Sequence, residues 1–337
     1  MNADTKQPID GTITMKTKES NATKLAHSAN AASATSAAKQ PLDNAAKAVN
    51  QISPAKNDKG DKPIWFITGC STGFGRSLAL TLLERGYKTV VTSRNTDDIQ
   101  DMASNENALV LKLDVTDAGE VAEAMKQALK RFGHVDVLVN NAGIGYFAAI
   151  EESETDKVRK MFDINFFGAS SMIDAVLPSM RERRKGFIVN LSSIGGLCSF
   201  PSVGFYSATK FALEGMSEAL RQEVAPLGIK VMVVEPSGFR TDWAGRSASE
   251  SKLQIADYAG TAGAGRKQVR AASGKQRGDP ERAAQAIIDV VESVNPPNHL
   301  LLGNDAVDAA LAKLDTLKKE FFLWEKVSRG ADFPVGK

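Results

Sequence analysis

Thr68-Gly69-Cys70-Ser71-Thr72-Gly73-Phe74-Gly75 is the stretch of this 337-residue sequence that decides its fold. It follows an apolar run from Pro63 that is rich in strand formers, and it precedes a run to Arg85 in which leucines recur at helical spacing. Glycines let backbone N–H groups approach a pyrophosphate, and a helix N-terminus adds partial positive charge. A strand, a glycine-rich turn and a helix in this order predict a phosphate cradle, with a tight structural turn as the alternative.

Tyr206 and Lys210 form the second informative feature, because they lie four residues apart at the start of a stretch that is typical of a helix. At this spacing both side chains project from one face. An ammonium beside a phenol stabilises the phenolate, so we expect the pKa of Tyr206 to fall from ~10 towards neutrality. Such a phenol can exchange a proton with an alcohol oxygen. The same pair on an ordinary helix is usually a solvated face, so the upstream motifs decide between the two.

These motifs together resemble the short-chain dehydrogenase/reductase family. The glycine stretch fits the family's cofactor motif Thr-Gly-x-x-x-Gly-x-Gly rather than G-x-G-x-x-G. Asn140-Asn141-Ala142-Gly143 resembles the segment that stabilises the central sheet beside the cofactor, and Pro236-Ser-Gly-Phe-Arg-Thr241 resembles the Pro-Gly motif after the sixth strand. The matches run in the family's order from about Lys62 to Pro236, and the pattern looks most like the retinol and hydroxysteroid dehydrogenase-like branch.

The resemblance implies four catalytic residues, namely Asn165, Ser193, Tyr206 and Lys210. Ser193, and not Ser192, lies at the family's usual distance before the tyrosine. In this interpretation Ser193 hydrogen-bonds the substrate oxygen and Tyr206 protonates it. Lys210 tunes the tyrosine and holds the nicotinamide ribose, while Asn165 kinks a helix and holds a water bound to the lysine.

Ser93 and Arg94, at the tip of the second expected strand, favour NADP(H) over NAD. A carboxylate at this place binds a ribose 2′-OH, whereas an arginine accommodates a 2′-phosphate. NAD-preferring relatives carry Asp where this chain has Ser93, and Arg94 can hold phosphate oxygens in a bidentate fork. A solvated loop arginine is the alternative. The full set of expected cofactor contacts is Thr68, Gly69, Ser71, Thr72, Gly73, Phe74, Gly75, Ser93, Arg94, Asp114, Asn141, Ala142, Gly143, Tyr206, Lys210, Pro236, Gly238 and Thr241.

Strand-like and helical runs alternate along residues 62–337, which predicts one α/β domain with a doubly wound Rossmann fold and a parallel seven-stranded sheet. The ligand crevice is expected at the carboxyl ends of the strands. By family analogy the segment at about 240–277 covers the substrate as a mobile lid. The seven strands are expected near 63–68, 88–92, 109–114, 135–140, 186–192, 230–235 and 299–302, and a terminal helix at 311–326.

Residues 1–61 are predicted to be a disordered, low-complexity tail, because no aromatic residue precedes Trp65. The stretch 21–39 contains no acid, which leaves organellar targeting open. Transit peptides are Arg-rich, however, and the first arginine is Arg76. No apolar stretch approaches the ~20 residues that a membrane span needs. We therefore expect a soluble, cytoplasmic protein.

The remaining composition narrows the partners to a small-molecule carbonyl or alcohol. A net charge of +2 and scattered basic residues give no nucleic-acid footprint. The three histidines, His27, His134 and His299, are not at ligand spacing, so no metal site is expected. A homo-oligomer is left open.

The predicted function is an NADP(H)-dependent oxidoreductase that interconverts a carbonyl and an alcohol by hydride transfer. Two alternatives remain. One is an NAD-linked alcohol dehydrogenase of the same fold, and the other is a non-catalytic dinucleotide-binding sensor. Sensors of this kind typically lose the tyrosine or the lysine, and this chain keeps both. The sequence does not separate steroid, retinoid, ketoacyl and small-ketone substrates.

Overall fold

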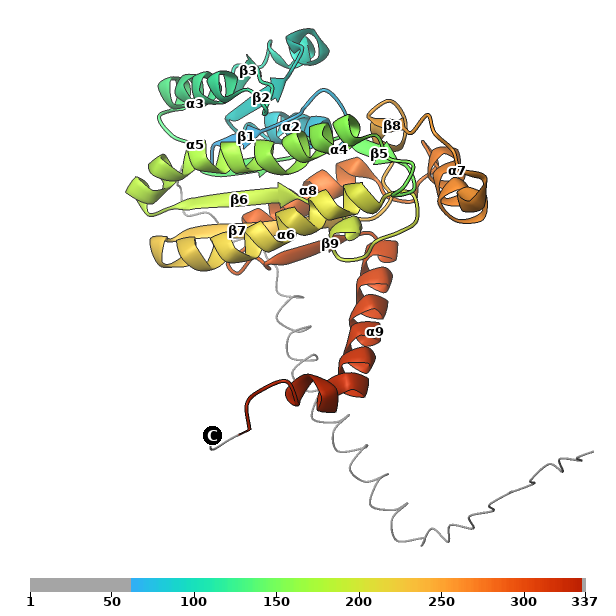
Figure 1. Ribbon diagram of the computed structural model, residues 1–337. Helices are drawn as coiled ribbons and strands as arrows, with labels where there is room; N and C mark the ends of the chain where they lie inside the picture. Colours follow the sequence, from blue (N-terminus) through green and yellow to red (C-terminus); the bar gives the residue numbers. More distant parts are fainter. Residues whose placement is uncertain (1–61, 335–337) are drawn as a thin grey trace, which may run out of the picture. The chain divides into compact units, whose positions relative to one another are not determined.

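The computed structural model describes residues 62–334, and the predicted tail at 1–61 lies outside them. The described part contains a seven-stranded sheet in the order β3-β2-β1-β4-β6-β7-β9, with every neighbouring pair parallel (Figure 1). This confirms the predicted doubly wound α/β domain. The strands are β1 (Trp65–Ile67), β2 (Thr89–Ser93), β3 (Ala108–Lys112), β4 (Val137–Asn140), β6 (Gly186–Leu191), β7 (Ile229–Pro236) and β9 (His299–Leu302).

Helices cover both faces of this sheet. Helices α2 (Gly73–Glu84) and α8 (Pro280–Val291) pack together on one face, while α3 (Ala118–Phe132), α5 (Gly168–Arg183) and α6 (Gly204–Val224) cover the other (Figure 1). Successive side chains of a strand point to opposite faces. In β1, accordingly, Trp65 and Ile67 join the core under α2 and α8, whereas Phe66 joins the core under α3 and α5.

Short turns and helices complete the framework between these elements. The 3₁₀ turns are η1 (Thr96–Met102), η3 (Ile194–Gly196), η4 (Ala225–Leu227), η5 (Asp242–Ala244) and η6 (Ala256–Tyr258). The remaining helical pieces are α4 (Thr155–Phe162), the π-helical turns η2 (Asp163–Phe167) and η7 (Ala259–Gly263), and α7 (Ala264–Ala271).

The terminal helix α9 (Asn304–Arg329) begins seven residues before the predicted start at Leu311. Gly303, at φ 91°, ends the segment after β9, and the first turns then bury the small side chains of Ala306 and Ala310 against the domain. Alanines carry too little apolar surface to mark a buried face in a periodicity pattern. The helix was therefore predicted too short.

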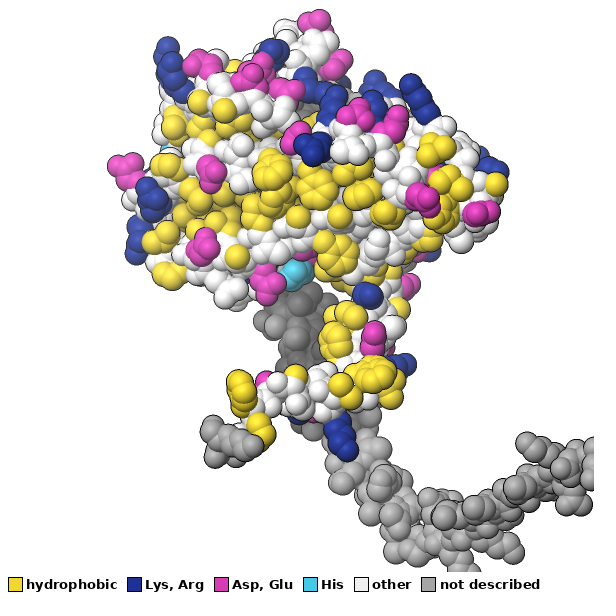
Figure 2. All heavy atoms as spheres, viewed as in Figure 1, with side chains coloured by type: hydrophobic (Ala, Val, Ile, Leu, Met, Phe, Trp, Pro, Cys, Tyr) yellow, Lys and Arg dark blue, Asp and Glu magenta, His cyan; other side chains and the backbone are white. Residues whose placement is uncertain are grey.

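The outer part of α9 extends away from the sheet and exposes large apolar side chains, which are visible as yellow spheres in Figure 2. Leu314, Phe321 and Trp324 are each more than half exposed. Surface that is this apolar on a projecting helix indicates an interaction site. Within residues 62–334, no helix combines the length and the apolar character that crossing a membrane requires.

The segment at 240–277, expected as a lid, is folded into short elements. Its strand β8 (Ala248–Glu250) pairs in parallel with β5 (Gly145–Phe147), which follows β4. The sequence analysis missed both strands, because three residues are too few to show a period of two.

A buried ion pair fastens this segment to the rest of the domain. The Arg266 guanidinium donates to Glu152 Oε2 at 3.1 Å, and both side chains are at most 6% exposed. The same carboxylate accepts from the backbone N–H groups of Ala149 and Ile255, at 3.0 and 2.9 Å. Glu152 therefore joins the segment after β5 to two parts of the 240–277 segment, the turn at Ile255 and helix α7.

We predict that Glu152→Ala destabilises the domain by roughly 3–5 kcal/mol, because it leaves a buried guanidinium without its partner. Thermal unfolding followed by circular dichroism measures the loss. Arg246→Ala is the matched control, since it breaks the exposed lid pair Arg246–Asp242 and should cost at most about 1 kcal/mol. Equal, small losses in both variants would show that the Glu152 pair does not fasten the lid.

Candidate active site

A cavity of about 1030 Å³ opens where the carboxyl ends of the strands meet, as predicted for this fold. It is lined by residues from the glycine turn, from the ends of β2, β4, β6 and β7, from α6 and from the lid. Thr68, Gly75 and Asn165 are not part of the lining. The expected site residues that do line it are Gly69, Ser71, Thr72, Gly73, Phe74, Ser93, Arg94, Asp114, Asn141, Ala142, Gly143, Ser193, Tyr206, Lys210, Pro236, Gly238 and Thr241.

Hydrogen bonds from the residues directly after β4 hold the glycine turn in place. The Asn141 side-chain amide donates to the carbonyls of Thr68 and Gly69, both at 2.8 Å. Thr68 Oγ1 in turn accepts from the backbone N–H groups of Asn141 and Ala142, at 2.9 and 3.0 Å. A Cβ at Gly75 would overlap the Asn141 amide and the Gly69 carbonyl. Thr68 and Gly75 therefore shape the glycine turn without lining the cavity.

The cradle itself is open backbone. Gly69 and Gly73 adopt φ values of 73° and 59°, which favour glycine because other residues are strained there. Helix α2 begins at Gly73, and its N-cap residue, Thr72, makes no side-chain capping hydrogen bond. The first backbone N–H groups of α2 are thus free of a side-chain cap at the cavity wall, and such N–H groups bind anions.

Ser193 and Tyr206 lie against each other at the far end of the cavity. Ser193 Oγ accepts from the backbone N–H of Gly195 at 3.0 Å in the turn after β6. Tyr206 is in the first turns of α6 and is buried. Burial raises the pKa of Tyr206 to about 12, and the hydrogen bond with Ser193 opposes the rise. The phenol is therefore protonated at neutral pH.

Lys210, one turn further along α6, is also buried. Its Nζ donates to the backbone carbonyl of Leu191 at 2.7 Å and lies 5.8 Å from the centroid of the Tyr206 ring. Burial lowers the pKa of this ammonium to about 8, and the charge of Glu214 opposes the fall. The expectation that Lys210 brings the pKa of Tyr206 towards neutrality is wrong for this arrangement, because burial of the phenol raises its pKa and only the hydrogen bond with Ser193 opposes the rise.

Asn165 lies in the π-helical turn η2 between α4 and α5, where the sequence analysis expects a helix kink. Its Oδ1 accepts from the backbone N–H of Ile144 at 2.8 Å. Its Nδ2 donates to the Ile144 carbonyl at 3.0 Å and to Thr209 Oγ1 at 3.2 Å. The side chain thus joins the segment after β4 to α6, next to Lys210. Its expected contact with a lysine-bound water stays a prediction.

At the other end of the cavity, Ser93 is the buried last residue of β2 and Arg94 is the exposed residue after it. Asp114 accepts from the backbone N–H and the hydroxyl of Thr116, at 3.0 and 2.7 Å. Burial raises the pKa of Asp114, but these hydrogen bonds and the charge of Arg94 outweigh it, so the net shift is downwards. This end of the cavity therefore combines a hydroxyl, a guanidinium and an ionised carboxylate.

Trp243 also lines the cavity and was not among the expected site residues. Its ring centroid lies 4.8 Å from that of Tyr206 and 5.4 Å from that of Phe147. The indole forms an apolar wall beside the phenol. Its position two residues after Thr241, in the Pro-Gly motif, was the available signal.

The comparisons agree with this geometry. Residues 63–252 match the family model described as short chain dehydrogenase. The 3-ketodihydrosphingosine reductase of Bacteroides thetaiotaomicron is 39% identical over 243 residues, which cover 71% of this chain and 87% of that protein. Among solved structures, a short-chain dehydrogenase from Streptomyces avermitilis is 42% identical, with a TM-score of 0.76, and covers 81% of this chain and 100% of its own. ElxO with NADP bound is 28% identical, with a TM-score of 0.61, over 73% of this chain and 99% of its own.

The family model alone spans more than half of the chain, and the two relatives at 39% and 42% identity are covered over most of their own length. Ser193, Tyr206, Lys210 and the glycine turn lie within that matched region and line one cavity. The chain belongs to the short-chain dehydrogenase/reductase family, whose members are oxidoreductases that work with a nicotinamide dinucleotide.

Proposed function

We propose that this protein is an NADP(H)-dependent oxidoreductase that interconverts a carbonyl and an alcohol at a site formed by Ser193, Tyr206, Lys210 and Asn165. The observation that carries the proposal is that Ser193, Tyr206 and Lys210 share one cavity with the glycine cradle. A dinucleotide bound along this cavity supplies or accepts the hydride. The chain's own residues bind it, orient the substrate and manage one proton.

The cavity fits the dinucleotide at both ends. Near α2, positive-φ glycines and uncapped backbone N–H groups suit a pyrophosphate. Ser93 places no carboxylate against a ribose 2′-phosphate, and Arg94 offers a guanidinium fork. ElxO, a relative that binds NADP, supports this choice by similarity. The alternative is that this protein uses NAD, and the guanidinium of Arg94 argues against it.

For reduction, Ser193 holds the substrate oxygen while Tyr206 transfers its proton to it. A phenol that stays protonated at neutral pH suits this direction, because it arrives at the reaction as an acid. Lys210 also lines the cavity, and in this proposal it bonds the ribose hydroxyls of the cofactor. A general acid of this kind accelerates a reaction by ~10²–10⁴-fold. A non-catalytic sensor has no need of this arrangement.

The substrate that the site supports is a ketone or aldehyde with an apolar substituent, because Trp243 and Phe147 form an apolar wall beside Tyr206. The 3-ketodihydrosphingosine reductase relative is consistent with such a carbonyl. Membership of the retinol and hydroxysteroid dehydrogenase-like branch is part of the same proposal, since those substrates are also apolar.

Tyr206→Phe should lower turnover by about two to four orders of magnitude while NADPH still binds, because it removes only the hydroxyl that carries the proton. NADPH oxidation followed at 340 nm with a panel of apolar aldehydes and ketones measures turnover, and NADPH fluorescence measures binding. Tyr146→Phe is the matched control, since the Tyr146 hydroxyl bonds Glu154 instead of lining the cavity. Wild-type turnover in Tyr206→Phe would refute the assignment of the proton donor.

Arg94→Ala should weaken NADPH binding by about 10–100-fold and leave NADH binding nearly unchanged, because a charge-assisted hydrogen bond contributes ~1.5–3 kcal/mol. Calorimetric titration with both cofactors measures the difference. Arg85→Ala is the control, since Arg85 lies at the opposite end of α2. Equal weakening of both cofactors by Arg94→Ala would show that this side chain does not read the 2′-phosphate.

We further propose that α9 pairs with α9 of a second copy. Val307, Leu314 and Phe321 recur every seven residues, and Leu317 and Trp324 lie three residues after the last two, which is the pattern of a helix seam. The start of α9 carries Asp305 and Asp308, and its end carries Lys326 and Arg329. Antiparallel pairing brings these opposite charges together, and one patch then serves both copies, as two-fold symmetry requires.

Replacing both Leu314 and Phe321 by Asp should convert a dimer to a monomer, because it puts charges into the centre of the seam. Light scattering coupled to size-exclusion chromatography measures the mass of the full chain. Lys313→Asp with Lys319→Asp adds the same number of carboxylates to the helix outside the seam and should leave the dimer intact if the seam forms the contact. A wild-type monomer, or a dimer that persists in the Leu314 and Phe321 variant, would contradict the pairing.

A further inference from the structure

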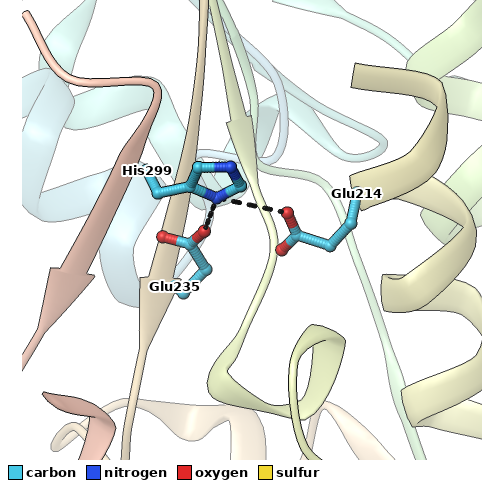
Figure 3. A group of neighbouring side chains, drawn as sticks. All are labelled: Glu214, Glu235 and His299. Carbon is cyan, nitrogen blue, oxygen red and sulfur yellow. Dashed lines mark hydrogen bonds and ion pairs between the residues drawn. The ribbon is translucent and has the colours of Figure 1, made fainter. Parts of the chain in front are cut away.

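Three side chains that can bind a metal converge behind the active-site lysine. Glu214 comes from α6, Glu235 from β7 and His299 from the first residue of β9, and Figure 3 shows them pointing toward one another. His299 Nδ1 lies 2.6 Å from Glu235 Oε1 and 3.8 Å from Glu214 Oε2. Each of the three offers a ligand atom, and these atoms all lie within 4.8 Å of one another. The cluster is absent from the cavity lining, so it is a separate site.

The two carboxylates are buried, and three of their four oxygens have no hydrogen-bond partner within the described residues. The Glu235 side chain is fully buried, and that of Glu214 is 10% exposed. Within the described residues, Glu235 Oε2 and both Glu214 oxygens have no hydrogen-bond partner. An unpaired buried carboxylate is costly. These oxygens therefore form a built acceptor site.

The surrounding charges leave the cluster short of positive charge. The basic side chains that face the pair are His299, Lys210 and Arg221. Lys210 donates to the Leu191 carbonyl and Arg221 to the Val231 carbonyl, so neither satisfies the orphan carboxylate oxygens. A ligand with concentrated positive charge would do so.

We propose that Glu214, Glu235 and His299 bind a divalent cation of the zinc type. An imidazole nitrogen with two carboxylate oxygens is a ligand set that zinc accepts, and three protein ligands leave one position for water. Magnesium and calcium instead require six or more oxygen ligands, so an imidazole suits them poorly.

The observed positions need only a small adjustment to hold such an ion. Zinc lies about 2.0–2.2 Å from nitrogen and oxygen ligands, so two tetrahedral ligand atoms stand about 3.4 Å apart. The two measured separations from His299 Nδ1, 2.6 and 3.8 Å, lie on either side of this value. The His299 side chain is 48% exposed. Its ring can therefore turn to adjust these two separations, and it gives the ion a route from solvent.

The test is calorimetric titration of the chelator-treated full chain with zinc chloride. We expect one saturable site per chain, a rise in melting temperature with zinc, and no comparable binding of magnesium chloride. His299→Ala and Glu214→Gln should each weaken zinc binding by more than about tenfold, because losing a ligand costs more than losing a residue that only orients one. Glu214→Gln keeps the side-chain shape, so it decides the question even if His299→Ala fails to fold.

His134→Ala is the matched control for the histidine variant. His134 also lies beside a carboxylate, with Nε2 3.1 Å from Asp136 Oδ2, and its side chain is 38% exposed. Among the described residues, His134 does not belong to a group of three or more side chains that could bind a metal ion. Zinc binding should survive this change. The proposal is overturned if the wild type binds no zinc at a saturable site, or if folded Glu214→Gln and His299→Ala bind zinc as the wild type does.

Discussion

The hydrogen bonds of Asn141 fix the glycine turn on which the rest of this site depends. The Asn141 side chain bonds the carbonyls of Thr68 and Gly69, and its backbone N–H bonds the Thr68 hydroxyl. These bonds join the end of β4 to the end of β1, so two neighbouring strands determine the path of the chain into α2. The close approach leaves no room for a side chain at Gly75. These hydrogen bonds thereby hold the first turn of α2 at the cavity wall.

Helix α6 supplies the complementary constraint at the other end of the cavity. Tyr206, Lys210 and Glu214 follow one another at intervals of four residues, which places them along one face of the helix. Burial acts on each of them and always disfavours the charged form: it raises the pKa of the phenol and the carboxyl and lowers that of the ammonium. Tyr206 and the two ionisable groups behind it are therefore one structural unit, set by the packing of one helix.

The fold was predictable because strands of a parallel sheet are buried on both faces and read as continuous apolar runs. All seven were expected within a few residues of β1, β2, β3, β4, β6, β7 and β9. The members of the cavity were also predictable, because the family's motifs name them and the ends of parallel strands meet at one edge. Strands β5 and β8 were missed, since their pairing is set by tertiary contact and three residues carry no pattern.

The environment of the site residues was harder to predict from the sequence than their position in the fold. The pair Tyr206 and Lys210 was expected to shift the tyrosine pKa down, but spacing on a helix says nothing of how deeply a phenol is buried. The cluster of Glu214, Glu235 and His299 was likewise not predictable, because its members are 21 and 64 residues apart and meet only where α6 packs on β7 and β7 lies beside β9. Sequence spacing finds ligands within one element, whereas tertiary packing brings these three together.

The parts of the site differ in how much they can change without loss of the fold. The cofactor cradle is made of backbone and the proton donor stands on a rigid helix, so neither can change much without loss of the fold. The lid is different, because Trp243 meets Tyr206 through a side chain carried on a short turn. That turn is held directly by Arg270, which bonds the carbonyls of Ala244 and Gly245 as well as Glu250, and more remotely by the buried pair Glu152–Arg266. A change of side chain at residue 243 therefore alters the cavity wall and leaves the fastenings of this segment in place.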